Sequence, residues 1–535
     1  MRTLPRNLSW VASDRATIPY SQRGICYGCT LVVSTVVGPR SAGRRSRRRG
    51  TISTPSIWSD VRRRYDGSGK IVSERESSEG DRSIFQQDYD RLLFSSPVRR
   101  LADKTQVWPM DTNDGVRTRL THSHEVANLA RSIATAVAGA SGGAAFGRQE
   151  LYRTIQPIVS AIGLSHDLGN PPFGHQGEVA MGSWFECRRS WIFSHEREGE
   201  GANELEDKVP ANLITEFVDF DGNPQTMRVM ARLQTSHHNV GLDLTAATLA
   251  ASLKYPVHAD TRDKDRDHIK KAGYFESERD VVEWVRAETG LEEGQRHPLT
   301  WIMEACDDIA YSVLDVDDLL KKGIISPDDV LTVLKHTAGV RDLDSVAKLE
   351  KKFIEVNDSP RRAEIRRDIK EQFVRAYMMK ALIADAGDAY ARNADAIMAY
   401  EFEKPIMQGN ALCDVMKEIA RKYAFANPAV LHSEAIGAAA IDGLMSVFWS
   451  AIQNRKKPED LMSKRLEARD SYAFSLISPN YLEAACREAN ATGGGGRVRR
   501  YHELRLLTDM ISGMTDSFAI NTWQKLSNVP TIVRA

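Results

Sequence analysis

The chain has 535 residues, 42% of them hydrophobic and 27% charged, which is ordinary for a soluble protein with more than one domain. Lys plus Arg and Asp plus Glu both number 72, so the net charge neither favours nor excludes a polyanionic partner. Six cysteines exclude a disulfide framework and favour a reducing compartment. The apolar run 29–37 is too short to span a membrane and starts too late for a signal peptide. We therefore expect a cytoplasmic protein with no membrane partner.

Residues 1–80 differ from the rest of the chain, because they are rich in Ser, Gly and Arg and show no sustained period. Arginines cluster at 44–49 (RRSRRR) and at 62–64 (RRR). The simplest interpretation is a disordered basic tail, or a start site placed too far upstream; a nucleic-acid-binding arm is the alternative. Cys26 and Cys29 form a CxxC pair here. Since no second pair stands at zinc-ribbon spacing, we favour a chance occurrence over a redox or zinc role.

From Ile84 onward, nearly every apolar segment keeps the 3.6-residue period of an α-helix. Further helices are expected at 151–165, 226–236, 244–254, 279–289 and 300–320. No alternating strand pattern of useful length occurs. We therefore predict an all-α protein, with a catalytic core over 81–325 and a helical region over 326–535 that contributes to the core and to an oligomer interface.

The segment 161–178, AIGLSHDLGNPPFGHQGE, carries the densest set of chemical groups. An apolar helical run ends in the adjacent pair His166 and Asp167, and a Gly-Asn-Pro-Pro turn separates this pair from His175 and Glu178. Imidazole nitrogen and carboxylate oxygen both suit borderline-hard divalent cations. His175 and Glu178 are three residues apart, a spacing that places two side chains on one helix face. The segment therefore predicts metal ligands beside an oriented acid/base pair, as in a hydrolase.

Two further helices carry candidate partners. His122 stands at the start of a predicted helix, just after Thr121 as the expected N-cap. Asp307, Tyr311 and Asp315 follow at intervals of four and form one polar ribbon on the helix expected at 300–320. A solvent-exposed edge is the alternative interpretation of this ribbon.

Four of these residues form a coherent set. His122, His166, Asp167 and Asp307 can hold one divalent ion and leave positions open for water and a phosphate oxygen. Asp308, next to this set, points about 100° away on the helix and is interpreted as a solvated neighbour.

The same residues match the H…HD…D pattern of the HD-domain phosphohydrolases. The longer strings RRLADKTQVWP, RTRLTHS, HDLGNPPFGHQGE, LKYP, HPLTWIMEACDDIAYSVLD and ISGMTDSFA, in this order, resemble the bacterial dGTP triphosphohydrolases. The resemblance covers roughly 82–525 with gaps. It implies an HD-domain helical core with an additional C-terminal helical region. It also implies metal-dependent hydrolysis of dGTP to deoxyguanosine and inorganic tripolyphosphate, by attack of water at the α-phosphate.

The resemblance also implies roles for individual residues. His122, His166, Asp167 and Asp307 would bind one divalent ion, Mg²⁺ or Mn²⁺, and His175 and Glu178 correspond to the family's catalytic pair. The positions that match its nucleotide pocket are Gln106, Arg119, Lys254, Tyr255, Tyr311 and Asp315. A homo-oligomer, typically a hexamer, and a single-stranded DNA effector are implied in the same way. His124 departs from the pattern and is interpreted as a surface residue.

These residues suit the reaction chemically. Arg119 and Lys254 would neutralise phosphate oxygens that the metal does not contact. His175 suits donation of a proton to the sugar 5′-oxygen or its removal from water, and the sequence leaves both roles open. Gln106 and Asp315 would bind the 3′-hydroxyl, while the Tyr311 ring would lie where a ribose 2′-hydroxyl clashes.

Three other functions stay open. The first is a broad-specificity dNTP triphosphohydrolase of the same family. The second is another HD phosphohydrolase, such as a cyclic-nucleotide phosphodiesterase or a nucleotidase, which would need neither LKYP nor the polar ribbon. The third is a nucleic-acid-binding dNTP sensor that uses the arginine-rich tail and keeps the pocket for sensing only.

Overall fold

The computed structural model describes seven segments of the chain: residues 54–76, 80–111, 113–147, 149–194, 208–458, 460–491 and 499–529. All of them belong to one unit, Thr54–Ala535. The predictions made for residues 1–53, including the arginine cluster at 44–49 and the pair Cys26 and Cys29, lie outside the described residues.

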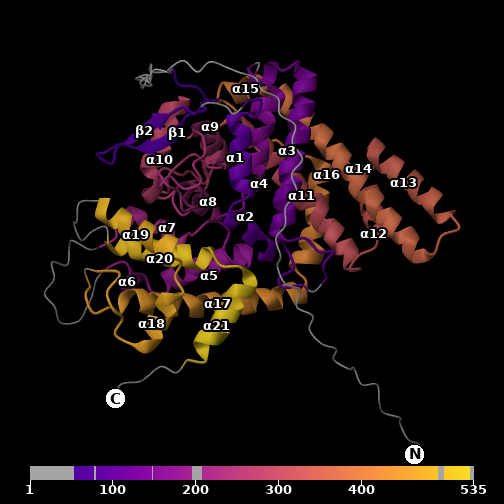
Figure 1. Ribbon diagram of the computed structural model, residues 1–535. Helices are drawn as coiled ribbons and strands as arrows, with labels where there is room; N and C mark the ends of the chain where they lie inside the picture. Colours follow the sequence, from indigo (N-terminus) through magenta and orange to yellow (C-terminus); the bar gives the residue numbers. More distant parts are fainter. Residues whose placement is uncertain are drawn as a thin grey trace, which may run out of the picture. The chain divides into compact units, whose positions relative to one another are not determined.

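Helices dominate the described residues, so the predicted all-α class is confirmed (Figure 1). The helices up to residue 321 are α1 (Ile84–Leu93), α2 (Ser96–Arg100), α3 (Arg119–Ser141), α4 (Gln156–Ser165), α5 (Gly174–Glu186), α6 (Arg189–Ile192), α7 (Thr215–Val218), α8 (Gly222–Ala231), α9 (Ala246–Ser252), α10 (Arg279–Thr289) and α11 (Pro298–Lys321). The helices that follow are α12 (Pro327–His336), α13 (Asp344–Asn357), α14 (Ala363–Arg392), α15 (Ala394–Met398), α16 (Ala411–Ala420), α17 (Pro428–Gln453), α18 (Ala468–Ser475), α19 (Pro479–Ala491), α20 (Arg499–Ser512) and α21 (Asp516–Ser527).

Short 3₁₀ and π segments connect several helices: η1 (Leu101–Asp103), η2 (Ala144–Phe146), η3 (Leu151–Ile155), η4 (Ala211–Leu213), η5 (Asp267–Ile269), η6 (Glu276–Glu278) and η7 (Arg421–Phe425). The helix predicted at 151–165 is thus a π segment that leads into α4. Its predicted start falls in η3 because a periodic apolar pattern does not distinguish a π turn from an α turn.

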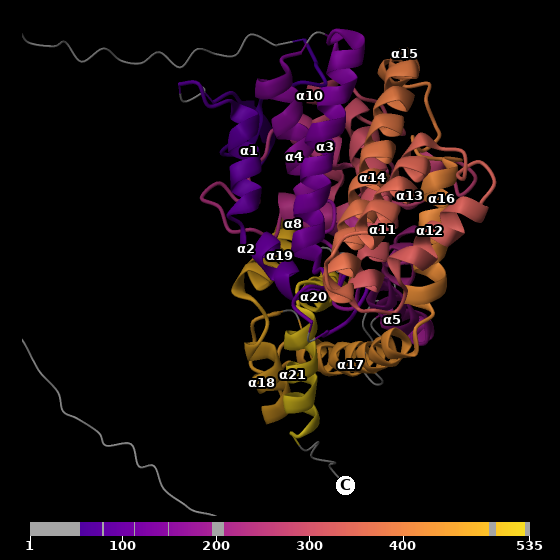
Figure 2. The same ribbon diagram turned by 90° about the vertical axis from the view of Figure 1, so that its right-hand side faces the viewer.

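Helix α3 begins three residues earlier than predicted. Its N-cap is Thr118, and the hydroxyl of Thr121 accepts a hydrogen bond from the Thr118 backbone N–H (3.1 Å). Thr121 therefore belongs to a capping box inside the first turn and is not the N-cap itself. His122 follows it on the buried face of the helix. Helix α3 lies beside α4 and α11 (Figure 2), so its first turn faces the helices that carry the other candidate ligands.

Two hydrophobic clusters form the core. One joins apolar side chains of α3, α4 and α11 to those of α14 and α16. The other joins α5, α8, α9 and α10 to α17, α20 and α21. Each cluster contains residues from both sides of position 325, so this position does not separate two cores.

Helix α17 is long and apolar enough, by length and composition alone, to cross a membrane. More than half of the most apolar stretch of this helix is buried, however, and the helix packs against α5, α18, α20 and α21. This packing is that of a core helix, and it places the first turns of α17 beside α5, which carries His175.

Residues 62–74 form an antiparallel hairpin of β1 (Arg62–Tyr65) and β2 (Ile71–Glu74), with Arg62 paired to Glu74. The Arg62 side chain is fully buried, and its Nη1 donates to Asp88 Oδ1 of α1 (2.7 Å). The structure therefore differs from the predicted tail over 54–76. Ion pairs with buried and half-buried acids hold this strand of three arginines in place. The strand therefore shows no apolar alternation from which it could be predicted.

Candidate functional site

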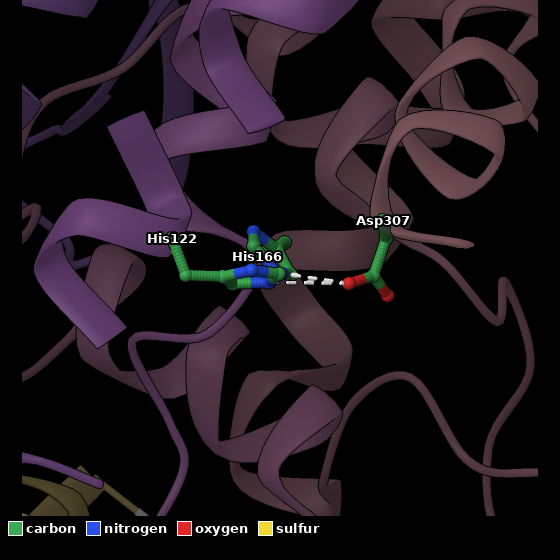
Figure 3. A group of neighbouring side chains, drawn as sticks. All are labelled: His122, His166 and Asp307. Atoms are coloured by element: carbon green, nitrogen blue, oxygen red, sulfur yellow. Dashed lines mark ion pairs between the residues drawn. The ribbon is translucent and has the colours of Figure 1, made fainter. Parts of the chain in front are cut away.

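Three separate helices bring together two histidines and an aspartate (Figure 3). His122 comes from α3, His166 caps the C-terminus of α4, and Asp307 lies in the middle of α11. Nε2 of His122 is 3.4 Å from Asp307 Oδ1, and Nε2 of His166 is 3.5 Å from the same oxygen. One donor atom from each residue lies within 4.8 Å of the others, which is the spacing of a metal-ion site.

The tautomer of His166 also fits a metal ligand. Its Nδ1 lies 2.7 Å from the carbonyl oxygen of Gly163, so Nδ1 carries the proton and donates it. Its buried Nε2 makes no hydrogen bond with the described residues and lies 3.5 Å from Asp307 Oδ1. A backbone carbonyl that fixes one ring nitrogen and leaves the other free is the usual support of a metal-binding histidine. The described residues therefore fit a divalent cation at this position.

The fourth expected ligand, Asp167, lies at the edge of this group. Its Oδ2 is 3.5 Å from His166 Nε2, but the same oxygen accepts a hydrogen bond from Arg119 Nη1 (2.5 Å). Its Oδ1 accepts one from Asn170 Nδ2 (2.6 Å). Asp167 thus stands beside the group of three, already held by two donors.

Both aspartates are charged in this arrangement. Burial opposes the charge of Asp307, but Lys254, whose Nζ lies 3.2 Å from Oδ2, and the neighbouring imidazoles hold the pKa of Asp307 well below its usual range. Burial also opposes the charge of Asp167, whereas Arg119 and His166 hold its pKa down at about 2. Both carboxylates are therefore ionised at neutral pH, the form that binds a cation.

A cavity of about 570 Å³ opens beside these residues. Every predicted site residue except Asp315 lines it: Gln106, Arg119, His122, His166, Asp167, His175, Glu178, Lys254, Tyr255, Asp307 and Tyr311. The structure thus brings together residues that are up to about two hundred positions apart in the sequence.

Asp315 lies one helical turn beyond Tyr311 and is fully buried behind the cavity wall. Its Oδ1 accepts a hydrogen bond from Arg117 Nη2, and the Nε of the same arginine donates to Asp318 (3.0 Å). Burial raises the pKa of Asp315 to about 7, although Arg117 opposes the rise. Its second oxygen, Oδ2, is buried and receives no hydrogen bond from the part of the chain that the structure describes.

His175 and Glu178 form the predicted pair on the first turns of α5. His175 Nδ1 lies 3.0 Å from Glu178 Oε2, and the other oxygen of Glu178 accepts the backbone N–H of Gly222 (2.7 Å). Glu178 is therefore fixed by the N-terminus of α8, while the His175 side chain is 78% exposed. The hydrogen bond to Glu178 raises the pKa of His175, and partial burial opposes the rise.

Glycines allow the HDLGNPPFGHQGE loop to lie against its neighbours. A Cβ on Gly169 would collide with the carbonyl oxygen of Gly222, the residue that holds Glu178. Gly174 has a φ of +56°, and a Cβ there would stand 2.5 Å from Arg119 Nη2. Close backbone contacts therefore fix the loop that joins His166 to His175.

Several lining residues were not found by sequence reasoning. Phe425, Leu431 and Glu434 come from η7 and α17, in the region interpreted as core and interface. The Phe425 ring stacks on Tyr311, with centroids 5.5 Å apart and planes 12° apart. Lys271 lines the cavity as well and pairs with Asp221 (2.5 Å). No spacing or motif marks these residues, because tertiary packing alone brings them to the site.

The sequence predicts surface positions for two neighbouring residues. His124 is exposed, so the prediction for it is confirmed. Asp308 is not a solvated neighbour, because its Oδ1 accepts a hydrogen bond from Lys417 of α16 (2.7 Å). The polar face of α11 thus serves two purposes: Asp307 and Tyr311 face the cavity, and Asp308 joins α11 to α16.

A second cavity, of about 800 Å³, shares His175, Glu178 and Lys271 with the first. It is lined by as many acidic as basic side chains, and Arg189, Arg262 and Lys271 pair with acids of the same wall. This larger cavity lacks the His-His-Asp group, so the smaller one is the candidate active site.

Comparison with curated proteins finds relatives over nearly the whole chain. The chain is 32% identical over 483 residues to a deoxyguanosinetriphosphate triphosphohydrolase-like protein of Listeria monocytogenes. The matched region covers 88% of this chain and 99% of the relative. The chain is 30% identical over 506 residues to a deoxyguanosinetriphosphate triphosphohydrolase of Salmonella paratyphi A, covering 87% and 97%. A third relative, from an Enterobacter species, carries the same name and is 31% identical over 487 residues, covering 83% and 94%. No protein-family model matches the chain.

Proposed function

The chain belongs to the deoxyguanosinetriphosphate triphosphohydrolase family, and we propose that it hydrolyses dGTP to deoxyguanosine and inorganic tripolyphosphate. The observation that carries this proposal is the convergence of His122, His166 and Asp307 in one cavity with the His175–Glu178 pair. A cation site beside an oriented imidazole is the equipment that attack of water on a phosphate requires.

His122, His166 and Asp307, with Asp167 beside them, would hold one divalent ion, Mg²⁺ or Mn²⁺. When bound, such an ion offsets the charge of the α-phosphate and acidifies water. Lys254 stands next to this group and would neutralise a further phosphate oxygen as a point charge.

His175 would move the proton. Its Nδ1 is engaged by Glu178, so Nε2 is the atom available to the reactants. Protonated, it can donate to the leaving 5′-oxygen of the sugar; neutral, it can take a proton from the attacking water. In both roles Glu178 stabilises the imidazolium and holds the ring in one orientation.

The sugar would be recognised by Gln106 and Tyr311, because Asp315 is buried outside the cavity. Among the described residues, Gln106 Oε1 is a buried acceptor that receives no hydrogen bond, which supports a donor such as the 3′-hydroxyl beside it. The Tyr311 ring, backed by Phe425, would exclude a 2′-hydroxyl. Arg119 and Tyr255 line the same cavity and complete the proposed nucleotide contacts.

Assembly and location are part of the same proposal. A homo-oligomer, typically a hexamer in this family, is supported by the exposed apolar side chains Val179, Leu431 and Ile436 on α5 and α17. Regulation by single-stranded DNA rests on family resemblance alone. Cytoplasmic localisation is supported by the packing of α17 into the core.

The proposal is tested by incubating the protein with each of the four dNTPs and with GTP, in Mg²⁺ or Mn²⁺, and resolving the products by ion-exchange chromatography. We expect deoxyguanosine and tripolyphosphate from dGTP, and much slower turnover of GTP. Equal turnover of all four dNTPs would establish the broad-specificity alternative. Monophosphate plus pyrophosphate would overturn the proposed bond cleavage, and binding of dNTPs without any product would favour the sensor.

A further inference from the structure

A single buried carboxylate joins two loops of the candidate active site. Asp516 is the first residue of α21 and is 2% exposed. Its Oδ1 accepts a hydrogen bond from the backbone N–H of Phe173 (3.0 Å). Its Oδ2 accepts one from the backbone N–H of Thr105 (3.0 Å) and another from the Thr105 hydroxyl. All three bonds cross more than three hundred positions of sequence.

Both partners of Asp516 stand next to residues that face the reactants. Phe173 is the N-cap of α5 and precedes His175 by two positions. Thr105 is the immediate neighbour of Gln106. Both partners line the cavity, whereas Asp516 is not among its lining residues. Any effect of Asp516 on the reaction must therefore pass through the two loops that it holds.

The loop at Phe173 needs such support. Phe173 has a φ of +61°, a left-handed conformation that is unfavourable for a residue with a Cβ. Its ring packs on Gly437 of α17, where an added Cβ would stand only 2.5 Å from the ring. The hydrogen bond that Phe173 donates to Asp516 and this packing hold together a turn that its own backbone energetics disfavour.

A second link runs parallel to the first. Lys104 is buried, and its Nζ donates to the carbonyl oxygen of Ser512 (2.7 Å) and to that of Asn170, in the loop that follows His166. Arg100 donates to the carbonyl oxygen of Gly513 (3.0 Å). The turn between α20 and α21 is therefore bonded on one side to the Lys104–Gln106 segment and on the other to the His166–His175 loop.

We propose that Asp516 is a positioning residue that sets His175 and Gln106 at fixed places relative to the His122, His166 and Asp307 group. This inference rests on the proposed function, because positioning is defined here by the reaction that it serves. A carboxylate suits the task because it offers acceptors to donors on both loops at once. A carboxamide has one acceptor oxygen and turns its NH₂ group toward the N–H of the other loop.

The test compares Asp516→Asn with a matched variant, Asp470→Asn. Asp470 is a 3% exposed carboxylate that accepts hydrogen bonds from Ser450 and Asn454, away from the active-site cavity. At a temperature where all proteins are folded, we expect Asp516→Asn to lower kcat by about 10²-fold, as for a misplaced catalytic group. Asp470→Asn should leave kcat unchanged.

A double-mutant cycle separates positioning from a general structural role. In the His175→Ala background, Asp516→Asn should no longer lower kcat, because the group that it positions is absent. Asp516→Asn should raise KM in both backgrounds, because the position of Gln106 depends on the hydrogen bonds between Thr105 and Asp516. An equal fractional loss of kcat with and without His175 would overturn the proposal.

Amide hydrogen exchange gives a readout that does not depend on the substrate. In Asp516→Asn we expect faster exchange in peptides that contain Phe173 and Thr105, and unchanged exchange in Asp470→Asn. Unchanged exchange at both loops would overturn the inference even if dGTP is the substrate. Conversely, faster exchange at both loops in a protein that hydrolyses no dNTP would support the link and refute the proposed function.

Discussion

Arg119 holds Asp167 through a hydrogen bond of 2.5 Å from Nη1 to Oδ2, and it reaches this carboxylate across the backbone of Gly174. The guanidinium passes where a side chain at position 174 would stand. The position of Asp167, the carboxylate expected to complete the metal site, therefore depends on the loop that carries His175.

We predict that Gly174→Ala lowers kcat/KM by about 10- to 100-fold, the usual effect of disturbing a residue that orients a metal ligand. The new Cβ would lie 2.5 Å from Arg119 Nη2 and force the guanidinium away from Asp167. The alanine would also have to adopt a left-handed backbone conformation, which lowers the free energy of unfolding of the variant by about 1–2 kcal/mol. Steady-state kinetics and urea unfolding measure the two effects.

Gly142→Ala is the matched control. Gly142 has a φ of +59° at the C-cap of α3, and apart from its own chain neighbours no described residue has an atom within 4 Å of the added Cβ. It should show the same loss of stability and no loss of activity. A comparable fall of kcat/KM in both variants would show that backbone strain alone explains the result.

Glu178→Gln should move the pH profile of the reaction toward lower pH. The hydrogen bond that His175 donates to Glu178 raises the pKa of His175 because the carboxylate stabilises the imidazolium. Without that charge the pKa of His175 falls. The limb of the kcat–pH profile that depends on His175 therefore moves to lower pH. The profile is measured with dGTP, and the His175 ring protons are titrated by NMR. The exposed His124 serves as the internal control, and an unmoved His175 titration would contradict the assignment.

Asp307→Asn should abolish metal binding. In the wild type, Mn²⁺ at about 100 times its Kd should raise the free energy of unfolding by about 2.7 kcal/mol. The variant should gain none of this, because the carboxylate oxygen shared by His122 and His166 is weakened as a ligand. Thermal unfolding with and without Mn²⁺ measures the difference. Asp308→Asn, which alters the neighbouring acid paired with Lys417, should keep the full gain.

Tyr311→Ala should reduce discrimination against ribonucleotides. The ring stacks on Phe425 and lines the cavity, so its removal opens space beside the sugar. We expect the ratio of kcat/KM for dGTP to that for GTP to fall by at least about tenfold, roughly 1.4 kcal/mol of transition-state binding. Tyr311→Phe keeps the ring and should keep the ratio. An unchanged ratio in Tyr311→Ala would refute this role.

Arg62→Met should destabilise the fold by about 3–5 kcal/mol, because it leaves the fully buried carboxylate of Asp88 without its charged partner. Urea unfolding measures the change. Arg341→Met removes one partner of an exposed ion pair and should stay within about 0.5 kcal/mol of the wild type. Equal effects of the two substitutions would show that the hairpin is not part of the stable fold.

Local pattern predicts the helices and the chemical groups of this protein well. The 3.6-residue period locates α3 and α11, and the spacing of His166, Asp167, His175 and Glu178 predicts side chains that do meet in one cavity. These side chains meet because each residue lies on or beside a helix, and the apolar pattern of that helix determines which of its faces is buried.

What the sequence does not reveal depends on contacts between distant segments. The hairpin at Arg62 is held by ion pairs, which leave no hydrophobic period to detect. Phe425, Leu431 and Glu434 sit in helical stripes that resemble ordinary packing, and only the approach of α17 to α5 brings them to the cavity. Asp315 follows the ribbon predicted for α11, but it is fully buried outside the cavity and bonded to Arg117, a contact that the spacing does not reveal.

The span of 343 positions between Phe173 and Asp516 has a consequence for the order of events during translation. A ribosome adds about 5–20 residues per second, so Asp516 is made tens of seconds after the loop that it holds. The candidate ligands up to Asp307 are synthesised well before then. The loop that carries His175 therefore receives this hydrogen bond only after α21 has been made, and it is among the last parts of the cavity to reach its final arrangement.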